Sequence, residues 1–396
     1  MRILYLVHRI PYPPNRGDRI RSYHLLRFLA EHAEVDLACL ADEAVEPAQT
    51  AELSRLCRRV AIERLGPGRW WRAARNLACG RSASEGLFDS PRLARTVADW
   101  ARQTRYDRAI AFCSSMVPYL NLPELRDIPA LVDLVDVDSQ KWFDYAAGAR
   151  GIKRGLFQWE GRRVQQLEQA AGRRASAVML ASAPEAAIYR ELCPRANTTA
   201  VTNGVDLDYF GAVRGMASAD SNHLSCVFVG ALDYKANIDG VVWFCRHVWP
   251  ALHERYPSAA FSLVGRNPTP AVSRLADQPG VRVVGGVPDV RPFLAGASVV
   301  VAPLQVARGI QNKVLEALAA GKAVVASPQA LEGIDLIVDR HARRADSPRE
   351  WVDAISQLFD NAEVRDRLGA AGRQLVETDY AWTPRLKPLE QLLKVG

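Results

Sequence analysis

The sequence predicts an α/β protein with two Rossmann-like domains, each built on a parallel sheet. Apolar runs of strand length alternate with helical patterns along nearly the whole chain, which is typical of doubly wound sheets. The alternation lapses between 203 and 224, in a stretch rich in Gly, Ser and Asp, and then restarts. A length of 396 residues also suits two domains better than one core. We therefore expect domains at 1–203 and 204–379 whose sheets face each other across a cleft.

The first domain is expected to contain strands at 3–7, 35–40, 108–112, 130–135 and 177–181. Helical patterns lie between these runs, at 19–31, 91–104 and 153–174. The N-terminal run is short and followed by His8 and Arg9, so it indicates a buried first strand and neither a signal peptide nor a membrane span. Because open parallel sheets bind ligands at the carboxyl ends of their strands, the loops after these runs are candidate binding positions.

The second domain is expected to contain strands at 224–230, 259–265, 281–286, 298–303 and 322–327. A helical pattern near 238–254 separates the first two runs. The tail at 379–393 is predicted to be helical after Pro384. We expect the C-terminal segment 380–396 to pack back on the first domain.

The composition is that of a soluble globular protein, with 48% hydrophobic and 24% charged residues. The seven cysteines form no C-x-x-C pair, so the sequence indicates neither a zinc site nor a disulfide framework. A reducing compartment fits these cysteines best. No window offers the roughly 18 continuous apolar residues of a spanning helix. We therefore expect a cytoplasmic protein.

The net charge of +7 is concentrated in two stretches. Residues 55–81 hold eight arginines against one acid, with Trp70 and Trp71 among them, and residues 150–174 hold seven basic residues against two acids. Arginine interleaved with aromatic residues is compatible with an anionic membrane surface, a solvated basic face or nucleic acid. No nucleic-acid motif accompanies the charge, so the first two alternatives remain, and peripheral attachment to the inner face of the plasma membrane is a hypothesis.

The segment 307–325 is predicted to form a turn, a helix, a Gly stop and a strand. Gly309 would let the backbone approach a ligand closely, and the amides that open the helix could hold phosphate. Lys313 and Glu316 occupy neighbouring helix positions. A carboxylate there could accept hydrogen bonds from the two hydroxyls of a ribose. The alternative is a surface glutamate paired with Lys313.

Several segments resemble a known enzyme family. FVGALDYKANID (228–239), LVG (263–265), VRVVGGVPDV (281–290) and APLQVARGIQNKVLEALAAGKAVV (302–325) resemble the second domain of retaining glycosyltransferases of family 4, which have the GT-B fold. NGVD (203–206) resembles the linker signature of that family. HRIPYPPNRGDRIRSYHLL (8–26) and DLVDVDSQKW (133–142) resemble the sugar transferases associated with exosortase (PEP-CTERM) systems, which belong to exopolysaccharide clusters.

The resemblance implies a donor site in the second domain. Glu316 matches the second acid of the family's Glu-x7-Glu pattern, which binds the nucleotide ribose. Arg308 stands where the first acid is expected, and a guanidinium cannot accept a hydrogen bond, so the donor-sugar contact must differ. The candidate contacts to nucleotide and phosphate are Gly230, Lys235, Arg266, Arg308, Gly309, Ile310, Gln311, Asn312, Lys313 and Glu316.

The resemblance also implies a loop of the first domain that reaches the donor phosphate and the acceptor. Its candidates are Asn15, Arg16, Gly17 and Arg21. The alternative is a Pro-rich loop whose helix is capped by Asp18. Asp138 or Ser139 is the expected substitute for a histidine that many relatives carry near this strand end.

The pair Asp136 and Asp138 has the spacing that holds a divalent cation in transferases of another fold. The pair ends a strand of the first domain, and GT-B enzymes generally work without a metal. We therefore expect no metal and no cofactor, only a nucleoside diphosphate sugar as donor.

The implied activity is retaining transfer of a sugar to a saccharide acceptor, expected to be lipid-linked. Missing paired catalytic carboxylates do not oppose it, because donor phosphate can act as the base in such transfer. A sugar-nucleotide epimerase of the same fold and a non-catalytic nucleotide-binding scaffold remain alternatives. A dehydrogenase is disfavoured, because no G-x-G-x-x-G follows the first strand.

Overall fold

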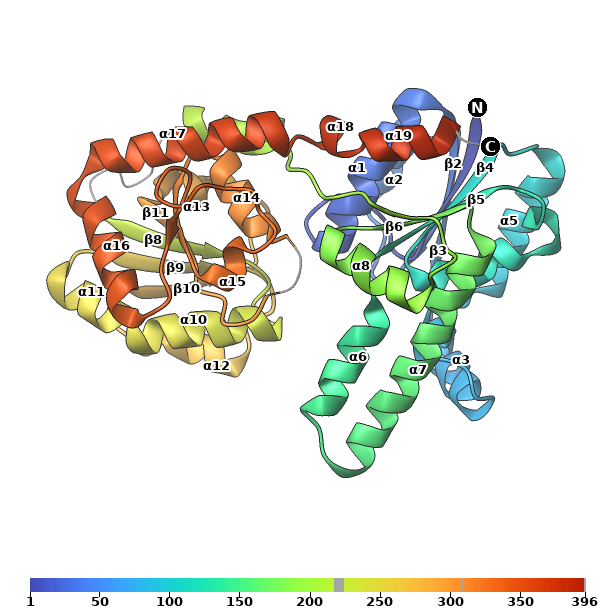
Figure 1. The fold of residues 1–396 in the computed structure, drawn as a ribbon, viewed down its shortest axis with the longest axis horizontal. Helices are drawn as coiled ribbons and strands as arrows, with labels where there is room; N and C mark the ends of the chain where they lie inside the picture. Colours follow the sequence, from blue (N-terminus) through green and yellow to red (C-terminus); the bar gives the residue numbers. More distant parts are fainter. Residues whose placement is uncertain (217–223, 308–309, 395–396) are drawn as a thin grey trace. The chain divides into compact units, whose positions relative to one another are not determined.

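The computed structural model describes residues 1–216, 224–307 and 310–394 (Figure 1). The chain divides into two compact units, one formed by residues 1–202 with the C-terminal segment from Leu386, and the other by Asn203–Arg385. Each unit is a parallel sheet covered by helices, so the predicted α/β class with two parallel-sheet domains is confirmed.

The sheet of unit 1 has the order β3-β2-β1-β4-β5-β6-β7, with every neighbouring pair parallel. The five predicted strands are present, and two further strands that the sequence pattern does not predict, β3 and β7, form the two edges. The strands are β1 (Arg2–Val7), β2 (Glu34–Ala41), β3 (Arg59–Arg64), β4 (Arg108–Phe112), β5 (Ala130–Val135), β6 (Ala177–Leu180) and β7 (Thr198–Ala200).

The helices of unit 1 include the three that the periodicity predicts, which appear as α1, α5 and α7. Their apolar faces pack on the sheet around Leu4, Leu6, Ala109 and Val132, which are fully buried. The helices are α1 (Gly17–His32), α2 (Pro47–Leu56), α3 (Gly68–Ala78), α4 (Ala83–Leu87), α5 (Pro91–Gln103), α6 (Asp138–Ala147), α7 (Gly151–Arg174), α8 (Ala183–Leu192) and α19 (Lys387–Lys394), with 3-10 turns η1 (Ser114–Asn121) and η2 (Pro123–Leu125).

The sheet of unit 2 has the order β10-β9-β8-β11-β12-β13. Its central strands β11 and β12 are continuous apolar runs, as expected of strands buried on both faces. The strands are β8 (Ser225–Val229), β9 (Ala260–Val264), β10 (Val281–Gly285), β11 (Val299–Ala302), β12 (Ala323–Ala326) and β13 (Arg343–Arg344).

The helix expected near 238–254 is two helices, α10 and α11, which meet at Val248. Pro250 lies at the start of α11 and has no backbone N–H to continue the α10 ladder, which explains the break. The helices of unit 2 are α9 (Leu207–Gly211), α10 (Lys235–His247), α11 (Trp249–Arg255), α12 (Pro270–Ser273), α13 (Arg291–Gly296), α14 (Asn312–Ala319), α15 (Pro328–Leu331), α16 (Pro348–Asp360), α17 (Ala362–Asp379) and α18 (Trp382–Arg385), with 3-10 turns η3 (Ala212–Gly215) and η4 (Arg274–Asp277).

The C-terminal tail becomes helical earlier than predicted, since α18 begins at Trp382 and not after Pro384. Pro384 lies in the first turn of α18, where the missing backbone N–H is tolerated. The start of unit 2 lies beside this tail. The Val205 amide donates to the Tyr380 carbonyl over 2.8 Å, and a Cβ on Gly204 would lie 2.7 Å from the Trp382 backbone.

Among the described residues, no helix combines the length and the apolar character needed to span a bilayer.

Candidate active site

Three glycines bring the carboxyl ends of β8, β9 and β10 together in unit 2. The Gly230 amide donates to the Val264 carbonyl over 2.9 Å, and the Gly265 amide donates to the Gly285 carbonyl over 2.8 Å. A Cβ on Gly265 would lie 1.7 Å from the Gly230 oxygen, so only glycine fits there. The edge therefore presents bare backbone, which a ligand can approach closely.

Two helices begin at this edge. A Cβ on Gly240 of α10 would lie 2.6 Å from the Pro303 carbonyl, and the buried Asn237 side chain donates to the Ala231 carbonyl over 2.8 Å. These contacts fix the first turns of α10 on the ends of β8 and β11. α14 begins at Asn312, and the Gln311 side chain does not cap its first amides.

Lys313 and Glu316 lie in the first turns of α14, and both side chains are half-buried. The Lys313 Nζ donates to Gln311 Oε1 over 3.3 Å and lies 5.9 Å from the centre of the Phe228 ring. Within the described residues, the Glu316 carboxylate makes no hydrogen bond and no ion pair. The structure thus gives no support to the alternative of a surface ion pair between the two.

The environment shifts both groups toward neutrality. Desolvation by the surrounding protein raises the pKa of Glu316 to about 7, and Lys313 offsets this only in part. Desolvation also lowers the pKa of Lys313 to about 8, against the opposing effect of Glu316. An acid and a base held with perturbed pKa values at the mouth of a sheet are typical of a binding or catalytic site.

A polar cluster beside Glu316 was not predicted. The Tyr209 hydroxyl of α9 donates to Asp289 Oδ1 over 2.9 Å, and Arg291 binds the same carboxylate through Nε and Nη2 at 3.0 and 2.7 Å. The Arg291 guanidinium lies 4.2 Å from the centre of the Tyr209 ring. Burial, the bond to Asp289 and, more weakly, the Glu316 charge raise the pKa of Tyr209 to about 12. The Asp-x-Arg pair after β10 is visible in the sequence, but such pairs are too common to indicate a site.

The remaining donor candidates take different places. Arg266 follows Gly265 at the end of β9, and its side chain lies over Gly286, where a Cβ would come within 2.9 Å of it. Lys235 is exposed and pairs with Asp239 at 2.7 Å along α10. Ile310 is half-buried near Gly333. Arg308 and Gly309 lie outside the described residues.

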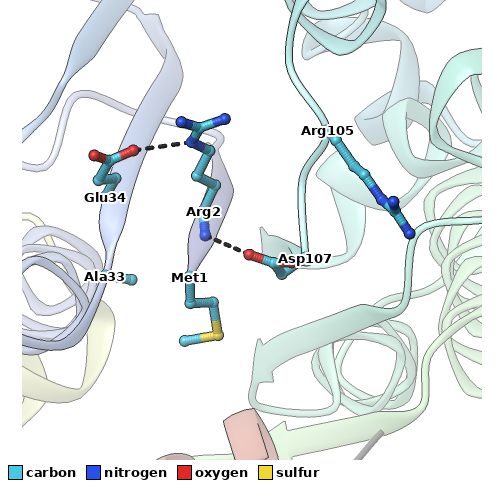
Figure 2. Close-up of a pocket in the computed structure, with 6 residues that line it drawn as sticks. All are labelled: Met1, Arg2, Ala33, Glu34, Arg105 and Asp107. Carbon is cyan, nitrogen blue, oxygen red and sulfur yellow. Dashed lines mark hydrogen bonds and ion pairs between the residues drawn. The ribbon is translucent and has the colours of Figure 1, made fainter.

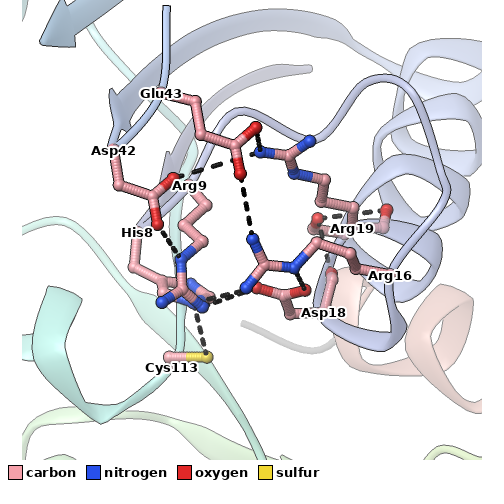
Figure 3. Close-up of polar contacts among 9 residues, drawn as sticks. His8, Arg9, Arg16, Asp18, Arg19, Asp42, Glu43 and Cys113 are labelled. Carbon is pink, nitrogen blue, oxygen red and sulfur yellow. Dashed lines mark hydrogen bonds and ion pairs between the residues drawn. The ribbon is translucent and has the colours of Figure 1, made fainter. Parts of the chain in front are cut away.

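At the carboxyl edge of the unit 1 sheet, Asp18 is the centre of a charged cluster (Figure 3). Its Oδ2 lies 2.8 Å from Arg9 Nη1 and 3.5 Å from His8 Nε2. Burial would raise the pKa of Asp18, but the bonds from His8 and Arg9 outweigh it and hold that pKa well below its usual range. The alternative in which Asp18 caps α1 is wrong, because Arg16 occupies the cap position and Asp18 lies in the first turn.

The loop candidates of unit 1 separate into two sets. Arg16 is half-buried and reaches Glu43 at 3.3 Å, and a Cβ on Gly17 would meet no atom within 4 Å, so this part of the loop borders open space. Asn15 opens the turn with its amide on the Pro13 carbonyl at 2.9 Å. Arg21 does not face the loop: it is fully buried, with Nε 2.9 Å from Asp133 Oδ2.

The candidates after β5 also differ. Ser139 is fully buried, and its hydroxyl donates to Glu168 Oε2 over 2.5 Å, so it holds the start of α6 to α7. Asp138 is half-buried, and burial raises its pKa against the opposing charges of Lys141 and His8. Because Ser139 is buried and bonded to Glu168, Asp138 is the better catalytic candidate of the two. Among the described residues, no group of three or more potential metal ligands is found.

Cys113 follows β4 and has a φ of 74°, and Val135 is the last residue of β5 and has a φ of 68°. These left-handed conformations are strained for residues with a Cβ, and such strain concentrates at functional sites. The Cys113 thiol lies 4.0 Å from His8 Nε2, so the strained edge adjoins the charged cluster.

A separate hollow of about 470 Å³ lies at the amino ends of the strands, lined by Met1, Arg2, Ala33, Glu34, Arg105 and Asp107 (Figure 2). The Arg2 side chain lies 3.0 Å from Glu34, and the Arg2 amide donates to Asp107 over 2.7 Å, so Arg2 binds both of these acids. It lies at the edge opposite the strand ends that carry the candidate residues. We do not assign it to the active site.

Comparison with known protein families decides the class of the second unit. Residues 223–361 match the family model described as Glycosyl transferases group 1. This unit is a group 1 glycosyltransferase domain. The chain that carries it is accordingly a glycosyltransferase. No curated protein matched by sequence.

Solved structures place the group 1 domain in a GT-B frame. Sucrose-phosphate synthase from Thermosynechococcus elongatus is similar with a TM-score of 0.72 and 16% identity, over 99% of this chain and 98% of that one. HepE of Anabaena, solved with UDP-glucose, is similar with a TM-score of 0.68 and 15% identity over 99% of both chains. WaaG, a glycosyltransferase of lipopolysaccharide biosynthesis, gives 0.65 and 13% over 100% of both. At these identities the likeness establishes the fold.

Proposed function

We propose that the chain is a retaining glycosyltransferase that moves a sugar from a nucleoside diphosphate sugar to a lipid-linked saccharide acceptor, in the synthesis of exopolysaccharide or another cell-surface glycan. The observation that carries the donor assignment is the desolvated carboxylate of Glu316, without a partner among the described residues and one turn behind the amides that open α14. A carboxylate in this state is suited to bind sugar hydroxyls. The complexes of HepE with UDP and UDP-glucose support a donor of this kind.

Each part of the edge has a role in this proposal. The carboxylate of Glu316 accepts hydrogen bonds from the ribose hydroxyls. The first amides of α14 and the Lys313 ammonium hold the diphosphate, and the bare backbone at Gly230 and Gly265 leaves room for it. Arg266, and Arg308 with Gly309, are proposed to add charge and donors there. Stabilising the charge that develops on the leaving diphosphate is the main electrostatic task of the reaction.

Unit 1 is proposed to supply the acceptor side, through Arg16 and Gly17 at the open end of the loop and through Asp138. The reaction needs no protein nucleophile if the acceptor oxygen attacks from the side of the leaving group and gives its proton to the donor phosphate. We propose a cytoplasmic location, peripheral on the inner face of the plasma membrane. All seven cysteines are free, which suits a reducing compartment.

A thermal-shift screen tests the donor assignment. UDP, GDP, ADP and their sugars are each added to the purified chain, and one nucleotide is expected to raise the melting temperature, since ligand at 100 times its Kd stabilises by about 2.7 kcal/mol. Release of the sugar from the matching donor then identifies a transferase. Formation of an isomeric nucleotide-sugar would indicate an epimerase, and binding without turnover would indicate a scaffold. No stabilisation by any nucleotide would contradict the proposal.

The affinity for the nucleoside diphosphate is expected to be highest between about pH 7 and pH 8. Below pH 7 Glu316, whose pKa is about 7, gains a proton and loses an acceptor for the ribose. Above pH 8 Lys313, whose pKa is about 8, loses the charge that holds the phosphates. Calorimetric titration from pH 6 to pH 9 measures this profile.

The control is Glu316→Gln, which keeps the shape of the side chain and cannot titrate. The terminal phosphate of the nucleoside diphosphate itself titrates at about pH 6, so the difference between the two proteins is the informative quantity. The variant is expected to lose the decline that begins below pH 7 and to keep the one above pH 8. Equal acid limbs in both proteins would exclude Glu316 as the titrating group.

A further inference from the structure

A helical arm of unit 1 consists of α3, α4, α6 and α7, and Figure 1 shows α6 and α7 projecting from the unit. α6 and α7 pack on each other as a hairpin, and α3 packs on α4. Gly86 of α4 lies so close to α3 that a Cβ would come within 2.7 Å of the Ala73 backbone. Gly161 of α7 is equally close to the Phe143 ring of α6. Each pair is therefore tightly packed.

α7 fastens the two pairs to each other and to the sheet. The buried Glu160 carboxylate accepts from the Ser82 hydroxyl at 2.7 Å and from the amides of Ala83 and Ser84 at 3.0 and 2.9 Å, which holds the start of α4. One end of α6 is held by the bond between Ser139 and Glu168 of α7. The two helix pairs of the arm are thus joined through α7.

Large apolar side chains on both pairs are left in solvent. Trp70 and Trp71 of α3 are 62% and 75% exposed, and Leu77 lies on the same helix. On α7, Ile152 is 94% exposed and Leu156, one turn later, is 49% exposed. Exposed tryptophan and isoleucine gathered on projecting helices are typical of a surface that buries them against a partner.

The charge around these side chains selects the partner. Residues 66–81 carry four arginines and no acid, and residues 145–159 carry three basic residues and no acid. The Arg69 guanidinium lies 5.3 Å from the centre of the Trp70 ring. Arg58 and Arg59 of the basic stretch 55–81 do not contribute, because both bind Asp36 beside β3. Arg75 and Arg81 pair with Asp89 and Glu85. Among the described residues, no ion pair is found for Arg69, Lys153 or Arg154. Apolar anchors beside such cations match an anionic bilayer, whereas a second copy of the chain would bring like charges together.

We propose that the helical arm docks unit 1 on an anionic lipid bilayer, with Trp70, Trp71, Ile152 and Leu156 entering the headgroup layer. Binding of the arm to a bilayer does not depend on the proposed function. Only the purpose of that binding rests on it. α6 begins at Asp138, so the arm joins the bilayer to the sheet edge assigned to the acceptor, and a lipid-linked saccharide would be met there.

Flotation of the full chain with vesicles tests the proposal. The chain is expected to float with vesicles of phosphatidylcholine and phosphatidylglycerol, not with phosphatidylcholine alone, and to be released by salt. Trp70→Ser with Trp71→Ser, and Ile152→Ser with Leu156→Ser, should each weaken binding about tenfold or more, because each pair removes apolar area from the lipid contact. Ile337→Ser is the matched control, since Ile337 is 55% exposed in unit 2, and should change nothing.

Charge reversal provides a second test of the proposal. Lys153→Glu with Arg154→Glu is expected to abolish flotation with the anionic vesicles, and Arg340→Glu with Arg349→Glu, an exposed pair in unit 2, is expected to leave most of it. Vesicle binding by the serine variants at the level of the unchanged chain would overturn the proposal. So would a dimer that these variants dissociate, which would identify a second copy as the partner. Nucleotide stabilisation, measured on the same samples, reports separately on the donor site.

Discussion

Replacing Glu316 by alanine is expected to lower the affinity for the nucleoside diphosphate about 100-fold and to leave the fold intact. Hydrogen bonds to a charged group contribute about 1.5–3 kcal/mol each, and a carboxylate that receives both ribose hydroxyls makes two of them. Part of this binding free energy is offset, because the carboxylate must lose water when it binds the ribose. Calorimetric titration of the chain and its variant with the nucleotide found in the screen measures the difference.

The stability of the unliganded variant separates loss of binding from loss of fold. Burial raises the pKa of Glu316 from its usual 4.5 to about 7, so the ionised side chain opposes folding above pH 4.5 and does so fully above pH 7. Glu316→Ala should therefore melt no lower than the unchanged chain at pH 8. Glu332→Ala, at an exposed position of unit 2, is the control and should bind normally. An unaltered nucleotide affinity in Glu316→Ala would defeat the donor assignment.

The fold could be predicted wherever burial on both faces shows in the sequence. β11 and β12 are continuous apolar runs because helices cover both of their faces. The missed strands β3, β7 and β13 are all edges of their sheets. β3 is RVAIER and only half-buried, and β13 has just two residues, so neither needs an apolar pattern. Edge strands form because a neighbouring strand offers hydrogen bonds, which a local pattern does not show.

The site was predictable where it depends on neighbours in the chain. The proximity of the candidates Lys313 and Glu316 could be predicted because helix geometry relates positions three apart. The pairing of Tyr209 with Asp289 joins residues 80 positions apart, and that of Ser139 with Glu168 joins α6 to α7. No local pattern contains such contacts. The raised pKa of Glu316 belongs to the same class, because it depends on the atoms that surround the carboxyl in the fold.

Arg21 is a residue whose role depends on a contact that no local pattern contains. Arg21→Met is expected to destabilise unit 1 by about 3–5 kcal/mol, because removing one partner of a buried ion pair leaves the other charge uncompensated. Arg21 and Asp133 are both fully buried, and their side chains meet at 2.9 Å. The Asp133 carboxylate also accepts from the Val135 amide at 3.0 Å, where the chain has a left-handed conformation. Thermal or urea unfolding measures the loss. Position in the first turns of α1 had suggested a charge that faces a ligand, and burial assigns Arg21 to the core instead.

Two controls make this expectation specific. Arg349 and Asp353 form an exposed pair, so Arg349→Met should cost less than about 1 kcal/mol. Adding Asp133→Asn to Arg21→Met removes the stranded charge and should restore part of the stability. The deficit should also shrink in acid: burial already raises the pKa of Asp133 against the pull of Arg21, and without that cation it rises further, so protonation relieves the penalty as the pH falls. If Arg21→Met has the same melting temperature as the unchanged chain at neutral pH, the pair of Arg21 and Asp133 does not hold β5 to α1. The conformation of the strand end that leads to Asp138 must then have another cause.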